Sequence, residues 1–112
     1  MQNKFHKNLT LERWKKFPKE TQILNIAAEF SRAKNWLIKK DEHKVLNCLD
    51  RFFELIDLTV NDLKWRKSLK ELLRFRDVLA EFYIKKDKKL DELVKLFRTL
   101  LNFNKFSSQV KI

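Results

Sequence analysis

Glycine is absent from this sequence of 112 residues, and the chain has one proline and one cysteine. A chain of this length would ordinarily contain about eight glycines. Motifs that bring the backbone close to a phosphate, or that need positive φ, depend on glycine. Their absence excludes the P-loop, the dinucleotide-binding fingerprint and the glycine-flanked nucleophile elbow. The single Cys48 cannot form an intrachain disulfide, and its apolar pattern with Val45 and Phe52 predicts a buried small side chain.

The sequence also lacks long apolar runs. No stretch of 18 apolar residues occurs, and the first residues lack the apolar segment of a secretion signal. We therefore expect a soluble, cytoplasmic protein without membrane contact. The length matches one domain, which we assign to residues 1–112, with frayed ends at 1–9 and 106–112.

Apolar residues recur at steps of three and four throughout, which predicts helices and no strands. Thr10, Asp41 and Asp87 have the residue type and position of N-caps, and Pro18 suits a first helical turn. The turn Asn61-Asp62 separates two further helices. The predicted helices cover residues 11–16, 18–40, 42–60, 63–85 and 88–103.

Four of these predicted helices are long and are joined by very short connections, a pattern that favours antiparallel neighbours. The expected fold class is all-α, an up-down-up-down four-helix bundle with a short extra N-terminal helix. Trp14 and Phe17 are expected to fold back from that short helix onto the core.

The net charge of +11 is concentrated towards the two ends of the sequence: +4 in residues 1–20, +2 in 21–84 and +5 in 85–112. In an up-down bundle the turns near residues 41 and 87 lie at one end, and those near 17 and 62 at the other. Such basic surfaces suit a polyanion. We therefore predict a nucleic-acid-binding set of Lys39, Lys40, Lys44, Lys85, Lys86, Lys88 and Lys89 at one pole. At the opposite pole we predict Lys64, Arg66 and Lys67, with Lys15, Lys16, Lys19 and Lys105 beside them.

A second group of charges lies close to the apolar stripes. Arg76 shares the helical register of Leu72 and Leu79, so its guanidinium must be paired or reach out to solvent. Candidate partners for Arg76 are Glu29 from the 18–40 helix and Glu54 or Asp57 from the 42–60 helix. We predict a buried polar network that joins Glu29, Arg32, Arg51, Glu54 and Arg76, and a ligand pocket is the alternative.

No constellation of catalytic or metal-binding residues is apparent. A di-iron bundle needs paired Glu-x-x-His motifs, and the only histidines, His6 and His43, do not follow a glutamate at that spacing. One cysteine and two distant histidines cannot supply four zinc ligands. We expect no catalytic residue, no metal, no cofactor and no enzymatic activity.

Several short strings in the sequence are distinctive. They are Glu-Arg-Trp at 12–14, Gln-Ile-Leu-Asn-Ile-Ala-Ala-Glu at 22–29, Arg-Phe-Phe-Glu-Leu-Ile-Asp-Leu-Thr at 51–59 and Leu-Lys-Glu-Leu at 69–72. Together they resemble a family of small bacterial helical proteins with no established activity, across residues 11–84. The resemblance implies a helical fold and supplies no catalytic assignment.

The sequence thus predicts a non-enzymatic, basic helical protein that works by binding. The leading hypothesis is an accessory subunit that contacts nucleic acid, RNA or DNA, or a nucleic-acid-processing protein partner. The alternative is a protein-interaction or oligomerisation module, such as an antitoxin-like protein or a nucleotidyltransferase partner, without nucleic-acid contact. Apolar residues on more than one face of the 18–40 helix leave a homo-oligomer open.

Overall fold

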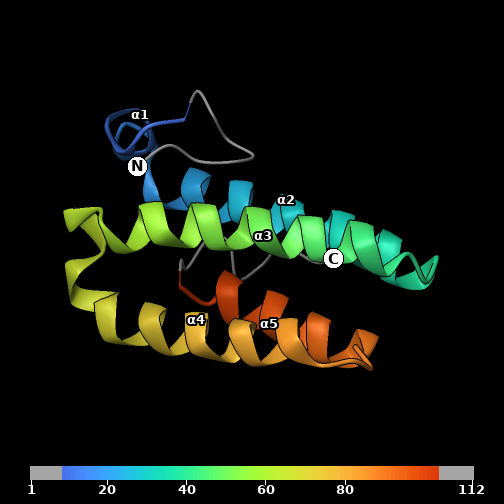
Figure 1. Cartoon of the computed structure of the whole chain (residues 1–112). Helices are drawn as coiled ribbons and strands as arrows, with labels where there is room; N and C mark the ends of the chain where they lie inside the picture. Colours follow the sequence, from blue (N-terminus) through green and yellow to red (C-terminus); the bar gives the residue numbers. More distant parts are fainter. Residues whose placement is uncertain (1–8, 104–112) are drawn as a thin grey trace.

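A computed structural model of this chain describes residues 9–103 (Figure 1). No strand occurs within these residues, so the predicted all-helical fold class is confirmed. The same residues form five α-helices and one 3-10 helix: α1 (Leu11–Lys15), α2 (Lys19–Ile38), α3 (Glu42–Val60), η1 (Leu63–Ser68), α4 (Leu69–Ile84) and α5 (Leu90–Leu101). The predicted frayed ends and Lys105 lie outside the described residues, apart from Leu9, which packs against the core.

Two of the predicted N-caps are confirmed by hydrogen bonds. The Thr10 hydroxyl accepts a hydrogen bond from the backbone N–H of Arg13 at 3.2 Å, and the Asp41 carboxylate accepts one from Lys44 at 3.1 Å. Each cap satisfies one of the donors left open at a helix start. These two residues therefore fix where α1 and α3 begin.

The predicted cap of the last helix, Asp87, is wrong. Helix α5 begins at Leu90 with Lys89 in the cap position, and no side chain of the described residues caps it. The chain leaves α4 with an extended backbone at Lys85, bends at residues 86 and 87 and is extended again at Lys89, so Asp87 lies two residues before the cap position. Acidic residues in the first turn, Asp91 and Glu92, instead face the positive end of the helix dipole.

The predicted helix over 63–85 divides into two elements, η1 and α4. The Asp62 carboxylate accepts a hydrogen bond from the Lys64 backbone N–H at 3.0 Å, which starts the 3-10 turns. Those turns bury the Trp65 side chain at the end of the core, and the α-helix begins only at Leu69. The tighter winding therefore serves to place the Trp65 indole.

The core is formed where successive helices pack together (Figure 1). Helix α2 packs against α3 and α5, and α4 packs against α3 and α5. The Phe30 ring lies at the centre, 4.0 Å from the Phe52 ring and 5.9 Å from the Phe97 ring, measured between centroids. Trp14 and Cys48 are buried, as predicted, whereas Phe17 stays partly exposed at the edge of the Trp14 ring. These contacts leave the connections between helices at the two ends of the molecule.

Candidate nucleic-acid interface

The excess positive charge lies outside the α-helices. Together the five α-helices contain twelve basic and twelve acidic residues, so the net charge of +11 comes entirely from η1, the connections and the chain ends. Within the connections 39–41 and 85–89 there are six lysines and two aspartates. The excess positive charge that could bind an anionic ligand is therefore at the ends of the helices.

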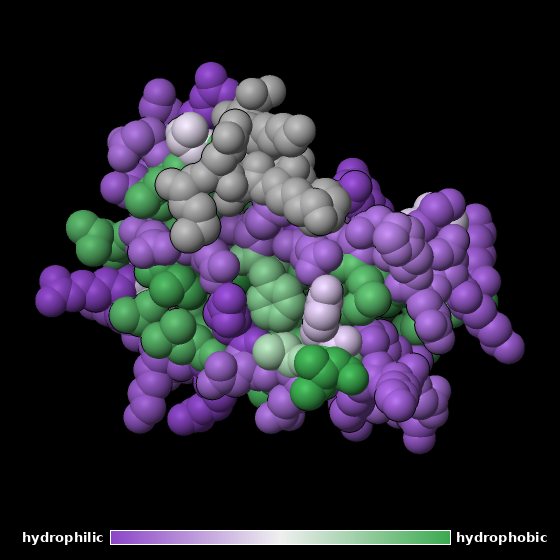
Figure 2. Space-filling view, viewed as in Figure 1, coloured by the Kyte–Doolittle hydropathy of each residue, from purple (hydrophilic) through white to green (hydrophobic). Residues whose placement is uncertain are grey.

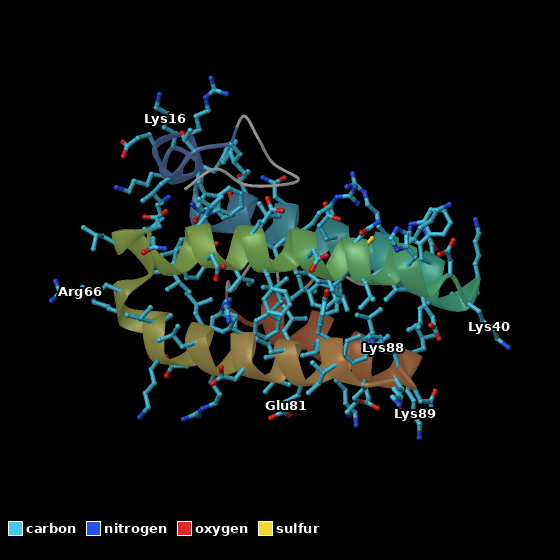
Figure 3. All side chains as sticks on the ribbon, viewed as in Figure 1. Lys16, Lys40, Arg66, Glu81, Lys88 and Lys89 are labelled. Atoms are coloured by element: carbon cyan, nitrogen blue, oxygen red, sulfur yellow. The ribbon has the colours of Figure 1, made fainter. Side chains whose placement is uncertain are left out.

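The connections 39–41 and 85–89 lie at the same end of the molecule, opposite η1 (Figure 1). Figure 3 shows Lys40, Lys88 and Lys89 at this end and Arg66 pointing away from the other. Helix α3 has 19 residues and spans the distance between the two ends, about 28 Å at 1.5 Å per residue. We call the first end the lysine pole, defined by Lys39, Lys40, Lys44, Lys85, Lys86, Lys88 and Lys89.

A groove of about 850 Å³ opens between the two connections of the lysine pole. Lys40 lines it from the α2–α3 connection, and Lys85, Lys86 and Lys88 line it from the α4–α5 connection. Its floor is apolar, with Leu37, Val45, Leu46, Tyr83 and Ile84. Figure 2 shows a mainly hydrophilic surface at this end of the molecule, with apolar patches nearer the middle. Glu42 and Asp87 also line it, so the groove combines a rim of four lysines and two carboxylates with an apolar floor.

The lysines of the pole differ in whether their amines are already paired with a carboxylate. Lys44 forms an ion pair with Asp41 at 3.8 Å, and Lys85 forms one with Glu92 at 2.5 Å. The hydrogen bond from Lys85 to Glu92 raises the pKa of this lysine. Among the described residues, no carboxylate oxygen lies within 4 Å of the other five amines, those of Lys39, Lys40, Lys86, Lys88 and Lys89.

Lys88 differs from the other four of these lysines because it is half-buried, whereas they are exposed. Its Nζ donates a hydrogen bond to the Lys85 carbonyl oxygen at 2.5 Å. Burial lowers the pKa of Lys88 because the charged form loses part of its hydration. A bound anion would restore that lost stabilisation, which makes Lys88 a favourable phosphate contact.

Lys40 has an unusual backbone conformation. Its φ is 60°, in the left-handed region that favours glycine, and it follows the last residues of α2. The N–H of Lys40 bonds to the Leu37 carbonyl and the N–H of Asp41 to the Trp36 carbonyl, at 3.1 and 3.0 Å, which is the Schellman pattern of a helix end. A lysine thus occupies the position where most chains would use glycine, and its side chain extends from the tip of the pole (Figure 3).

The Trp36 ring lies next to the amines of two lysines of the lysine pole. The amines of Lys39 and Lys44 lie 5.0 and 4.1 Å from the Trp36 ring centroid, within the range of cation–π attraction. This arrangement keeps both charges at the surface beside an aromatic platform.

The opposite pole, around η1, is organised differently. The Lys64 amine donates to the carbonyl oxygens of Lys15 and Phe17 and lies 3.5 Å from the Asp62 carboxylate, so it holds α1 and η1 together. Trp14 and Trp65 are fully buried and offer no ring face to a nucleic-acid base. The accessible charge of this pole comes from four exposed residues, Arg66, Lys67, Lys15 and Lys16, whereas Lys19 is half-buried with its amine 5.1 Å from the Trp65 ring centroid.

The predicted polar network is divided between separate contacts. Arg32 forms an ion pair with the buried Glu29 carboxylate at 2.9 Å, and the second Glu29 oxygen, Oε2, has no hydrogen-bond partner among the described residues. Arg76 instead bonds to Asp57 on α3 at 2.7 Å, because α4 packs against α3. Arg51 bonds to the Cys48 thiol, and burial together with Glu29 raises the pKa of that thiol despite this bond. Glu54 lies on α3, one turn beyond Arg51.

A buried polar cluster at the η1 pole could not be found from sequence pattern alone. The Gln22 amide donates to the Trp14 carbonyl and the Asp62 carboxylate, and its oxygen accepts from the Trp65 indole. The Trp14 indole in turn donates to the Thr59 hydroxyl at 3.1 Å. The feature of the sequence that could have indicated this cluster is a polar residue, Gln22, next to the apolar residues that α2 buries.

Other kinds of site find no support in the described part of the chain. Within residues 9–103, no three His, Cys, Asp or Glu side chains lie close enough to hold a metal ion. None of the helices there combines the length and the apolar character needed to cross a membrane. Comparisons with known proteins gave no match to a family, to a curated protein or to a solved structure.

Proposed function

We propose that this protein is a non-enzymatic nucleic-acid-binding protein that contacts the phosphate backbone through the lysine pole. One observation carries the proposal. Four lysines from two connections that are far apart in the sequence line a single groove and outnumber its two carboxylates, and five lysines of the pole have no carboxylate partner within the described residues. Because nucleic acids carry a regular array of phosphates, a cluster of available amines suits them.

The chemistry of the groove favours contact with phosphate and sugar over recognition of base sequence. Tyr83 is the aromatic residue that lines it, but its ring packs edge-on against the Phe53 ring at 5.8 Å. Its hydroxyl bonds to Asp50, and burial and this bond raise the pKa of Tyr83. Since the ring is already engaged, we expect binding with little dependence on base sequence.

A single-stranded region of RNA or DNA is the expected ligand. The groove is formed by two connections and does not present a protruding helix that could enter the major groove of a duplex. A flexible single strand can instead place successive phosphates near the separate lysines. We expect the protein to act as an accessory subunit, either on the nucleic acid alone or beside a processing partner.

The finer description of the fold forms part of the same proposal. We infer an up-down-up-down arrangement for α2 to α5, supported by short connections and by contacts of α2 with α3, α3 with α4, α4 with α5 and α2 with α5. A cytoplasmic location and membership of the bacterial family that the sequence resembles stay predictions.

Fluorescence anisotropy with a labelled 20-nucleotide strand tests the proposal. We expect the variant K40E/K86E/K89E to bind at least tenfold more weakly than the natural sequence at about 50 mM salt, because three attractive contacts become repulsive. The matched control K34E/K70E/K95E carries the same change in net charge on α2, α4 and α5. Equal weakening of both variants, or no binding by the natural sequence, would contradict a site at the lysine pole.

A further inference from the structure

A second groove, of about 490 Å³, runs between α4 and α5, away from the lysine pole. Its lining is mostly apolar and includes Phe75 and Val78 from α4 and Leu96 from α5. Val78 remains 45% exposed although it lies beside buried core residues. Phe75 and Leu96 are buried and form the floor of the groove, so Val78 is the exposed one of these three apolar side chains, and an apolar groove of this kind can accept a partner.

The charge of the two walls indicates what this groove can accept. Helix α4 has three basic and three acidic residues, and α5 has two of each, so both are neutral in a chain of net charge +11. A nucleic acid would gain little from such a surface. A second copy of this chain, which also carries +11, meets less repulsion there than at the basic ends, where close approach would oppose like charges.

Two charged side chains at the groove give it a self-complementary pattern. Glu71 and Arg74 are exposed, lie three residues apart on α4 and line the groove. Neither forms an ion pair among the described residues. When two copies of α4 cross in antiparallel fashion about a two-fold axis, Arg74 of each copy faces the Glu71 carboxylate of the other.

We propose that two copies of this protein associate through the α4–α5 groove, with reciprocal Glu71–Arg74 pairs beside the two-fold axis and Val78 about 8 Å further along α4. The face is about 24 Å long, from the 16 residues of α4, and about 20 Å wide, the width of two helices. The area of this face, about 480 Å², is smaller than the roughly 800 Å² that each partner buries in a standard stable interface. We therefore expect a reversible dimer with a Kd in the micromolar range.

Sedimentation velocity over about 5 to 500 μM protein tests the association. The mass of the natural sequence should rise from that of one chain towards that of two as the concentration increases. Arg74→Glu should raise the dimer Kd at least tenfold, because it sets two carboxylates against each other. Arg98→Glu is the matched control, since Arg98 is an exposed arginine of α5 that does not line the groove.

Reciprocal variants distinguish the specific pairing from a general effect of charge. The swap E71R/R74E restores opposite charges across the two-fold axis and should recover the dimer. An equal mixture of E71R and R74E should form heterodimers more strongly than either variant forms homodimers. A natural sequence that keeps the mass of one chain at all concentrations, or a swap that does not recover association, would overturn the proposal.

Discussion

The Gln22 amide nitrogen lies 2.9 Å from the Asp62 carboxylate, and this hydrogen bond joins the start of α2 to the residue that precedes η1. Both side chains are buried. The same amide nitrogen also donates to the Trp14 carbonyl oxygen at 2.8 Å. One side chain thus joins α1, α2 and the residue before η1, and it sets the geometry of the η1 pole.

Replacing Gln22 by Met should therefore lower the free energy of unfolding by about 2 to 4 kcal/mol. Methionine has a similar length, but it leaves the buried Trp65 indole N–H without an acceptor and removes the Gln22 hydrogen bond to the buried Asp62 carboxylate. Urea denaturation followed by circular dichroism measures the change. Asn25→Met, at an exposed position of the same helix, is the control and should shift the free energy by less than about 0.5 kcal/mol.

Asp62 should make stability depend on pH in the acid range. Burial alone would raise its pKa, but the hydrogen bond from Gln22 and the contacts with Lys64 outweigh it, so the pKa of Asp62 lies below its ordinary 3.8. The carboxylate form then stabilises the fold above about pH 4, and this contribution is lost as the pH falls through the lowered pKa.

The free energies of unfolding of the natural sequence and of Asp62→Asn, measured in urea at pH 7, 5, 4 and 3, test this dependence. The gap between the two proteins should be widest at pH 5 to 7 and should narrow below pH 4. A gap that stays constant down to pH 3 would mean that the Asp62 charge does not stabilise the fold.

Lys40→Gly should raise the free energy of unfolding by about 0.5 to 1 kcal/mol, because glycine adopts the φ of 60° without the strain of a β-carbon. Thermal unfolding should show an increase in Tm of a few degrees. Lys39→Gly provides the control, since Lys39 has an ordinary helical φ of −78° and glycine there only adds flexibility. A lower Tm for Lys40→Gly would show that the left-handed residue does not strain the α2 end.

Arg76→Glu should lower the free energy of unfolding by about 1–2 kcal/mol. The variant sets two carboxylates side by side at the 2.7 Å contact with Asp57 and removes the guanidinium from its place 5.1 Å from the Phe53 ring. Arg76→Ala should cost less than about 1 kcal/mol, since both charged partners are partly exposed to solvent. Adding Asp57→Arg to Arg76→Glu should recover part of the loss in urea denaturation, and a loss that is not recovered would show that the pair itself contributes nothing.

The helical periodicity was sufficient to predict the all-α class and most helix bounds, because apolar residues at steps of three and four have to face the core. Two local features could not be predicted in this way. The 3-10 turns of η1 depend on where the Trp65 indole can be buried, and the start of α5 at Leu90 depends on the path of the connection before it. Both are set by packing between segments that are distant in the sequence.

The candidate site was predictable only as a set of lysines. Sequence position placed residues 39–44 and 85–89 at the turns, and helix geometry places those turns at one end. The sequence could not show which amines are already engaged, as Lys44 and Lys85 are by Asp41 and Glu92. Likewise it suggested Glu29, Glu54 and Asp57 as partners of Arg76, and only the packing of α4 on α3 selects Asp57.

The salt dependence of binding tests the central claim most directly, because it counts the phosphates that the protein neutralises. Five available lysines predict that log K for a single strand falls with log salt at a slope of about −3.5. The variant K40A/K86A/K89A should bind more weakly, with a slope closer to zero by about 2. A slope near zero for the natural sequence, or an unchanged slope for this variant, would contradict phosphate binding at the lysine pole.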